Sequence, residues 1–350
     1  MKPNPFPFLL EKWNGVPPPT SSFTGKTIII TGANVGLGLE SAVIFTNLDA
    51  AKVILAVRTI TKGDAAKQQI ETRTGRKGVV EVWELDMNRF ASIESFAKRA
   101  EQQLPRLDVA VLNAGAAPKD YSLTPEGFET ILQVNVMGTA LLGLLLLPKL
   151  KASKTSEQDI PHLVIVTSEA HRWVERKDFP DTTPYGGNLL LAVNAEPKGS
   201  ESFAWTLQGA RTKLFTHYVV NELAKLMRKS SGEVECVVTS VCPGASKSDL
   251  MRDLGGFPSN VFLKIFDVLF NKTTEEGARV YVAASVLGPE GHGAWYKTTK
   301  LTTQGKLVTS PRGQEMQAQV WEEIVDALKV KVPAVEALAA GEFQKREGGL

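Results

Sequence analysis

Short apolar segments alternate with helical patterns along most of this 350-residue chain, and this alternation restricts its fold more than any other feature. The segments that predict strands are rich in β-branched residues and cover residues 26–32, 52–58, 79–86, 107–115, 162–168 and 234–244. Several are apolar almost throughout, which is typical of parallel strands covered on both faces. Helical patterns, such as residues 91–104, separate them. This order predicts an α/β fold, a doubly wound parallel sheet of the Rossmann type.

No linker divides the chain after the first strand, so we expect a single domain over residues 25–330. The prolines at 17–19 predict an extended N-terminal arm over residues 1–24, and residues 331–350 are expected to form a C-terminal tail. The most apolar segment, residues 136–148, is shorter than the ~20 residues that cross a bilayer, so we interpret it as a buried helix.

The composition is that of an ordinary globular protein, with 43% hydrophobic and 22% charged residues. A net charge of +2, with no basic run interleaved with aromatic residues, argues against a nucleic-acid partner. The two cysteines, Cys236 and Cys242, are about 20 Å apart on one extended strand and cannot pair with each other. Free thiols and the lack of a secretory signal predict a cytoplasmic protein. The four histidines and two cysteines show no metal-ligand spacing, so no metal is expected.

A glycine-rich turn follows the first predicted strand and opens a helix, at Gly32, Gly36 and Gly38 of the sequence TGANVGLG. Glycines allow the backbone to approach a pyrophosphate, and the N-terminus of the helix presents free N–H groups to its charge. The turn therefore predicts a dinucleotide-binding site, although such a turn by itself is also compatible with simple strand-to-helix packing.

Further motifs follow at the ends of the later strands: LDM at 85–87, LNAG at 112–115, VTSEAH at 166–171 and VCPG at 241–244. In this order, and with the glycine turn, they resemble the short-chain dehydrogenase/reductase family. The segments AVR…KG, VNV and VWEEIVDAL are similar to its retinol-dehydrogenase-like branch, common among fungal enzymes. The resemblance covers about residues 24–330 and implies an oxidoreductase, with a role in specialised (secondary) metabolism.

The resemblance implies a set of cofactor-binding residues: Gly32, Asn34, Gly36, Leu37, Gly38, Arg58, Lys62, Asp86, Asn113, Ala114, Gly115, Lys213, Pro243, Gly244 and Ser248. The second strand ends with Arg58 and Lys62 nearby and without the acidic residue that binds the ribose hydroxyls of NAD. Because a guanidinium group pairs well with a phosphate, NADP is the predicted cofactor.

In the resembled family a serine, a tyrosine, a lysine and an asparagine move the proton that accompanies hydride transfer. Ser168 matches the serine, Asn135 the asparagine and Lys213 the lysine. The tyrosine belongs four residues before the lysine, where this chain has Gly209. A lysine cation normally lowers the pKa of the tyrosine from about 10, so this sequence lacks the usual proton donor.

Other residues do not restore the motif. Tyr296 and Lys300 have the right spacing but lie in a segment that does not predict a helix. His217 shares a helix face with Lys213 but is directed away from the vacant position, and it is also compatible with a packed core residue. His171 is expected to be structural.

Two functions remain open from the sequence. The first is an NADP-dependent oxidoreductase acting on a lipophilic carbonyl or enone, with a water held by Ser168 and Lys213, or solvent, as the proton source. The second is a non-redox cyclase or isomerase, or a cofactor-binding protein without chemistry. Residues 257–277 are apolar and aromatic at helical spacing. They predict a lid at about 250–275 over a lipophilic substrate, or a face that packs on the sheet, forms a homodimer or contacts a membrane surface.

Overall fold

The computed structural model describes residues 15–195, 204–246 and 272–343, and within them eight strands form one sheet. The strands are β1 (Thr27–Thr31), β2 (Lys52–Val57), β3 (Val80–Glu84), β4 (Val109–Leu112), β5 (His162–Val166), β6 (Val237–Cys242), β7 (Trp295–Lys297) and β8 (Lys300–Thr302). Their order is β3-β2-β1-β4-β5-β6-β7-β8. All neighbouring strands are parallel except β7 and β8, which form an antiparallel hairpin at the edge. The doubly wound parallel sheet is therefore confirmed, with an antiparallel edge strand that was not predicted.

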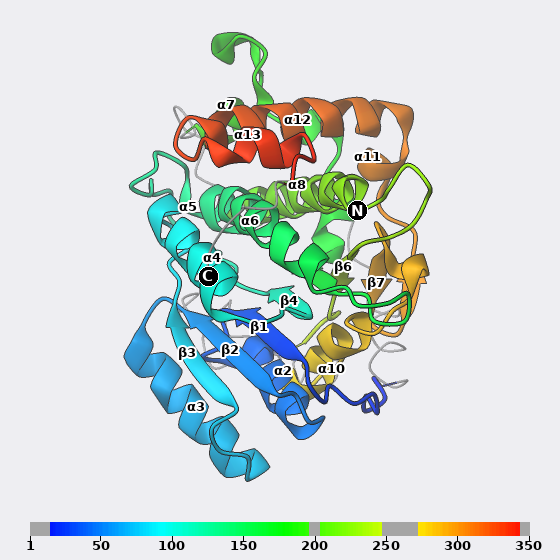
Figure 1. Ribbon diagram of the computed structural model, residues 1–350. Helices are drawn as coiled ribbons and strands as arrows, with labels where there is room; N and C mark the ends of the chain where they lie inside the picture. The colour runs from blue at the N-terminus through cyan, green and yellow to red at the C-terminus, as the bar shows by residue number, and fades with distance from the viewer. Residues whose placement is uncertain (1–14, 196–203, 247–271, 344–350) are drawn as a thin grey trace.

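Helices cover both faces of this sheet (Figure 1). One face carries α2 (Gly36–Asn47), α3 (Ile60–Thr74) and α10 (Thr274–Ala284), and the other carries α4 (Phe90–Gln103), α6 (Gly138–Ala152) and α8 (Trp205–Leu226). The shorter helical segments are α5 (Thr130–Leu132), η1 (Gln133–Met137), η2 (Glu169–Arg172), η3 (Arg176–Asp178), η4 (Thr183–Tyr185), α7 (Leu189–Asn194), η6 (Pro289–Gly291) and α11 (Lys306–Thr309).

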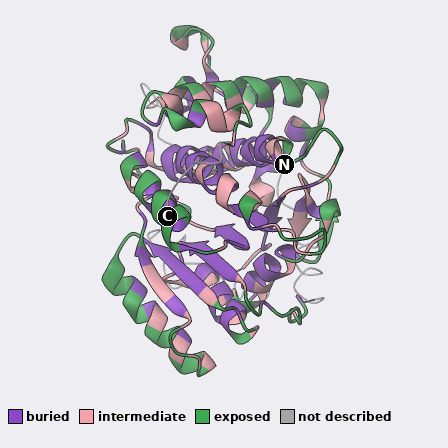
Figure 2. Cartoon of the chain, in the orientation of Figure 1, coloured by how far each residue is buried: buried purple, intermediate pink, exposed green. Residues whose placement is uncertain are grey.

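The alternation of side chains along β1 explains why its sequence is apolar throughout. Ile28 and Ile30 pack into the apolar cluster on the α2 and α10 face, whereas Ile29 packs into the cluster on the α4 and α6 face. Successive residues of a strand point to opposite faces, and here both faces are covered. The burial map shows the same result, because the central strands are buried along their whole length (Figure 2).

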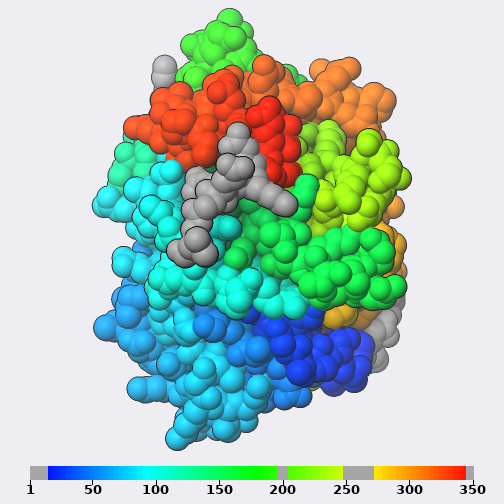
Figure 3. Space-filling view, in the orientation of Figure 1, coloured from blue at the N-terminus to red at the C-terminus, as the bar shows by residue number. Residues whose placement is uncertain are grey.

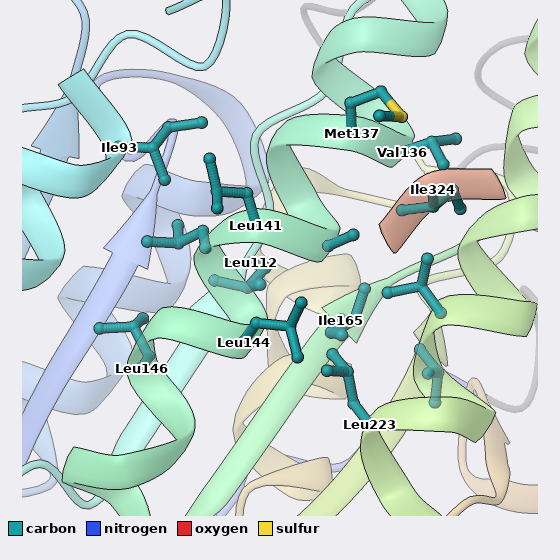
Figure 4. Packing of buried hydrophobic residues seen from close by; sticks show 14 of the residues in the cluster. Ile93, Leu112, Val136, Met137, Leu141, Leu144, Leu146, Ile165, Leu223 and Ile324 are labelled. Atoms are coloured by element: carbon teal, nitrogen blue, oxygen red, sulfur yellow. The ribbon is translucent and has the colours of Figure 1, made fainter. Parts of the chain in front are cut away.

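Residues 130–152 form a continuous helical segment through the centre of one layer, as predicted for the apolar run at 136–148. This segment is long and apolar enough to cross a membrane, but 89% of its most apolar window is buried inside the protein. Figure 4 shows Leu141 and Leu144 of α6 in a core that also receives Leu112 from β4, Ile165 from β5 and Leu223 from α8. It is therefore a core helix.

Two C-terminal helices, α12 (Pro311–Lys329) and α13 (Ala334–Ala339), complete this layer. Val320, Ile324 and Leu328 of α12 are buried in the same core as α6 and α8. Figure 3 shows these helices, in orange and red, across the top of the molecule. The predicted C-terminal tail therefore contains α13, which packs against α6.

The described part of the N-terminal arm, residues 15–23, lies against the opposite layer. Arg279 of α10 donates a hydrogen bond to the carbonyl oxygen of Val16 at 2.7 Å. The ring of Phe23 meets that of Phe45 in α2, with centroids 4.8 Å apart. These contacts hold the arm on the helices that flank the glycine turn.

Candidate functional site

A cavity of about 580 Å³ lies at the carboxyl ends of the parallel strands. It includes the point between β1 and β4 where the strand order reverses, which is where open α/β sheets bind ligands. The predicted cofactor residues that line it are Gly32, Asn34, Gly36, Leu37, Arg58, Lys62, Asp86, Asn113, Ala114, Gly115, Lys213, Pro243 and Gly244. The predicted catalytic residue Ser168 lines it too. Ser248, and all of the predicted lid except residues 272–275, lie outside the described residues.

The glycine turn between β1 and α2 forms the floor of one end of the cavity. Gly32 and Gly36 have φ values of +65° and +60°, a backbone conformation that favours glycine. Gly38 does not line the cavity but is required by packing, because a Cβ there would lie 2.7 Å from both Asn113 Nδ2 and the carbonyl oxygen of Gly32. Gly32 and Gly36 thus place no side chain in the cavity, and Gly38 allows the turn to pack closely against Asn113.

The NAG segment after β4 is fastened to β1. Asn113 donates from Nδ2 to the carbonyl oxygen of Thr31 at 2.9 Å, and the N–H of Ala114 donates to Thr31 Oγ1 at 2.8 Å. The contacts with Thr31 therefore fix the position of this segment, and with it the predicted cofactor residues that line the cavity.

Arg58 and Lys62 stand at the end of the cavity formed by β2 and the start of α3. Both are exposed, and their side chains form no hydrogen bond or ion pair with any residue that the structure describes. No acidic residue occurs between them. This end of the cavity is thus cationic and available to an anionic group.

Asp86 lies in the wall formed by the end of β3. Its Oδ1 accepts a hydrogen bond from the N–H of Asn88 at 3.0 Å, and its own N–H donates to Ser92 Oγ at 2.9 Å. Arg89 Nε lies 3.8 Å from Asp86 Oδ2. The turn is therefore held by local contacts, with the half-buried carboxylate at the cavity wall.

Ser168 follows β5 and caps the short helix η2. Its Oγ accepts a hydrogen bond from the N–H of Ala170 at 3.2 Å, so its own O–H remains able to donate. The buried ring of His171 lies 2.7 Å, through Nδ1, from the carbonyl oxygen of Ser168, and its Nε2 accepts from the N–H of Gly305 at 2.9 Å. Since Nε2 is the acceptor, Nδ1 carries the proton. His171 thus anchors the serine turn to the C-terminal part of the chain, which agrees with the structural role expected for it.

Lys213 enters the same end of the cavity from α8. Its Nζ donates to the carbonyl oxygen of Val166, two residues before Ser168, at 2.9 Å. Burial lowers the pKa of Lys213 to about 8, against a smaller opposing effect from the Cys242 thiol. The lysine and the serine are thus brought together, as the resemblance implies.

Asn135 does not line the cavity but supports it from the π-helical turn η1. Its side chain bonds both backbone groups of Ala116, accepting from the N–H at 2.9 Å and donating to the carbonyl at 3.1 Å. Its Nδ2 also lies 3.3 Å from Thr212 Oγ1. The backbone carbonyl oxygen of Asn135 accepts a hydrogen bond from Thr216 Oγ1 at 3.1 Å. Isolated π-helical turns often occur at functional sites. Here the turn links the loop after β4 to α8.

Gly209 occupies the position one turn before Lys213 in α8. A Cβ built on it would meet no heavy atom of the described residues within 4 Å, apart from its chain neighbours and the backbone of its own helix, so these residues leave the space beside it open. Tyr296 and Lys300, which match the missing motif in letters, belong to the β7–β8 hairpin and not to a helix. The hydroxyl of Tyr218 is bonded to the carbonyl oxygen of Leu307.

Several cavity-lining residues were not predicted as site residues. Thr167, Cys242 and Ser246 are neighbours of predicted ones, and their position beside the VTS and PG motifs was the available signal. Tyr281 lies on α10, far along the chain, and nothing in its surrounding sequence marks it.

The comparisons with known proteins agree with this geometry. The family model described as short chain dehydrogenase matches residues 26–185. A short-chain dehydrogenase/reductase of Phaeosphaeria nodorum is 39% identical over 345 residues, which cover 97% of each chain. One from Aspergillus flavipes is 40% identical over 325 residues, which cover 91% of each chain.

Among solved structures, an uncharacterized protein from Mycobacterium paratuberculosis matches with a TM-score of 0.60 and 25% identity, covering 93% of this chain and 97% of its own. Pseudomonas aeruginosa RhlG, solved as an NADP active-site complex, matches with a TM-score of 0.59 and 20% identity. That match covers 80% of this chain and 97% of RhlG, and it shows a shared fold.

Proposed function

Because this chain belongs to the short-chain dehydrogenase/reductase family, we propose that it is an NADP-dependent oxidoreductase that acts on a lipophilic carbonyl compound or enone. The family makes it an oxidoreductase enzyme that uses a nicotinamide dinucleotide and a small-molecule substrate. NADP in preference to NAD, the class of substrate and an atypical proton donor are the further parts of the proposal.

One observation carries it: a single cavity connects the cationic end at Arg58 and Lys62 with the end that holds Ser168 and Lys213. The first pair suits an anionic group and the second suits a carbonyl oxygen. A dinucleotide whose phosphate bound at the cationic end could thus place its reactive part at the end that holds Ser168 and Lys213.

The residues present fit such a cofactor. The backbone of the glycine turn lines the cavity with no side chain at Gly32 or Gly36, at the N-terminus of α2, where N–H groups attract phosphate. Two polar atoms buried in the wall, Asn88 Oδ1 and the hydroxyl of Tyr281, have no hydrogen-bond partner among the described residues. Buried polar atoms are nearly always bonded, so these two support a polar ligand.

The charge at the end of β2 favours NADP. The 2′-phosphate of NADP would pair with Arg58, with Lys62 nearby, whereas the ribose hydroxyls of NAD would find no carboxylate there. Asp86 would lie at the adenine.

Bound NADPH would supply the hydride. Ser168, with its free O–H, would hold the carbonyl oxygen of the substrate. Lys213 would bind the nicotinamide ribose, and Asn135 would keep the loop after β4 and α8 in register. With glycine at position 209, no phenol would stand one helical turn before Lys213, and the described residues leave the space beside that glycine open.

The apolar and aromatic sequence of residues 257–277 supports a lipophilic substrate. The fungal origin of the relatives supports a role in specialised metabolism, and the free cysteines support a cytoplasmic location.

The test is to incubate the protein with NADPH and a panel of lipophilic ketones, aldehydes and enones, and to follow both cofactor oxidation and product. We expect oxidation of NADPH in step with reduced product. Conversion of a compound without cofactor oxidation would instead support the cyclase or isomerase function.

A further inference from the structure

Carbonyl reduction needs a proton donor at the end of the cavity where Ser168 lies, and Gly209 has no side chain to supply it. The ionisable side chains that line the described cavity are Arg58, Lys62, Asp86, Lys213, Cys242 and Tyr281. The first three belong to the end of β2, the start of α3 and the end of β3, on the side of the cavity away from β5 and β6. Lys213, Cys242 and Tyr281 remain as donors near the serine.

Two of these three are poor proton donors. Tyr281 lies on α10, on the opposite face of the sheet from α8, and burial raises its pKa. Burial also raises the pKa of the Cys242 thiol. A group is an efficient general acid when its pKa lies near the operating pH, and burial moves both groups away from it.

The nearby histidines are also unavailable. Both ring nitrogens of His171 are engaged with backbone groups, at Ser168 and Gly305. His217 is completely buried one turn beyond Lys213 and does not line the cavity. Its ring lies against that of His171, with centroids 3.9 Å apart and the ring planes tilted by 42°.

Lys213 has the geometry that the reaction requires. An ammonium group carries three N–H donors. Among the residues that the structure describes, Nζ forms one hydrogen bond, to the carbonyl oxygen of Val166, which uses one of the three. That partner is a neutral carbonyl, and no carboxylate of the described residues forms an ion pair with the ammonium group. The helix position one turn before it is a glycine with open space, so no phenol separates the ammonium from a bound carbonyl.

We propose that the Lys213 ammonium itself donates the proton in carbonyl reduction, directly or through one water, in place of the missing phenol. This inference rests on the proposed function. As hydride arrives at the carbonyl carbon, the C=O π bond breaks and its oxygen takes a proton from Nζ. The lysine is left as a neutral amine, which solvent reprotonates. The substrate gains two electrons and two hydrogens, and NADPH becomes NADP⁺.

The surroundings of Nζ agree with this role. Burial lowers the pKa of Lys213 to about 8, so the ammonium predominates at neutral pH and yet releases its proton readily. The titratable groups that act on it are the Cys242 thiol of β6 and His217 of α8. The Glu169 carboxylate is already 2.9 Å from Nζ of Lys297. Glu129, the N-cap residue of α5, accepts a hydrogen bond from Gln208 and forms no ion pair with the lysine.

The experiment compares the wild type with Lys213→Arg, which keeps the positive charge but cannot act as an acid near neutral pH. Lys225→Arg is the matched control, because Lys225 is on the same helix and pairs with Glu222 at the surface. We would measure kcat/KM for ketone reduction from pH 6 to 10, NADPH binding by fluorescence, and the pKa of Lys213 in the free protein by NMR of ¹³C-labelled lysine.

In the wild type, reduction should fall about tenfold per pH unit above the pKa that NMR assigns to Lys213, because only the ammonium donates. Lys213→Arg should bind NADPH but lose roughly 10²–10⁴ in rate, and Lys225→Arg should behave as the wild type. An arginine variant that keeps its rate and its pH limb, or a limb that does not match the NMR pKa, would overturn the inference while leaving the reductase function intact. A wild type that oxidises no NADPH would overturn the proposed function, and the inference with it.

Discussion

Gly38 and Asn113 are packed so closely that a Cβ on the glycine would lie 2.7 Å from Nδ2 of the asparagine. The same Cβ would lie 2.7 Å from the carbonyl oxygen of Gly32, which is backbone and cannot rotate away. We therefore expect Gly38→Ala to lower the free energy of unfolding by about 1–3 kcal/mol and to weaken NADPH binding. Urea unfolding and calorimetric titration would measure the two effects.

Gly209→Ala makes the same chemical change where space is open. No heavy atom of the described residues outside its helix lies within 4 Å of an added Cβ, and glycine inside a helix is unfavourable. The free energy of unfolding should therefore rise by about 0.5–1 kcal/mol. The measurement is urea unfolding alongside Gly38→Ala. Destabilisation by Gly209→Ala would show that the space beside the glycine is not open.

Arg58→Ala should weaken NADPH binding much more than NADH binding. A hydrogen bond between charged groups contributes about 1.5–3 kcal/mol, so the loss for NADPH should be at least about tenfold. Isothermal titration with both cofactors tests this, with Arg312→Ala, an exposed arginine of α12, as the control. Equal affinity of the wild type for the two cofactors would contradict the argument from charge.

Much of this arrangement could be predicted from local sequence. All six predicted strands form. Apolar β-branched runs such as Ile28–Ile30 need burial on both faces, and in a doubly wound fold the central parallel strands provide it. The glycine turn and the ends of β4 and β6 also line one cavity as predicted, since the carboxyl ends of parallel strands meet at one edge of the sheet.

What could not be predicted depends on contacts between distant parts of the chain. The contact between the rings of His171 and His217 and the position of Tyr281 in the cavity wall arise only when η2, α8 and α10 meet around β6. The burial that lowers the pKa of Lys213 has the same origin. The sequence indicated that a lysine would be present, but not that it would line the cavity with a neutral carbonyl oxygen as its hydrogen-bond partner among the described residues.

Acid should destabilise the protein through its buried histidines. Burial lowers the pKa of His171 to about 4 from a usual 6.5, so the folded protein binds this proton more weakly than the unfolded chain does. The free energy of unfolding should therefore fall as the pH is lowered from about 6.5 to about 4. His171→Gln should reduce this slope, and because it removes the anchor of Ser168 it should also lower kcat. Urea midpoints measured across that pH range test the first effect.

His292→Gln provides the comparison. Burial lowers the pKa of His292 in the same direction, but this histidine bonds the backbone of Val238 and not the serine turn. His292→Gln should reduce the dependence of the unfolding free energy on pH and leave kcat unchanged. A fall in kcat of equal size in both variants would mean that His171 has no particular role in holding Ser168.

Gly209→Tyr tests what the vacant position does. The added Cβ meets open space, so the variant should fold, and its phenol should stand one turn from Lys213, whose cation lowers a phenol pKa. If the missing donor limits the rate, ketone reduction should rise by roughly 10²-fold or more, and the pH limb should move from the lysine to the phenol. The gain should disappear in Gly209→Tyr combined with Lys213→Met, because the phenol then keeps its usual pKa near 10.

If the glycine instead leaves room for a bulky substrate, the tyrosine variant should bind NADPH normally but lose activity on the native substrate while gaining it on small ketones. Steady-state kinetics on a small and a bulky ketone separate the two results. No change on either substrate would mean that residue 209 lies outside the path of both proton and substrate.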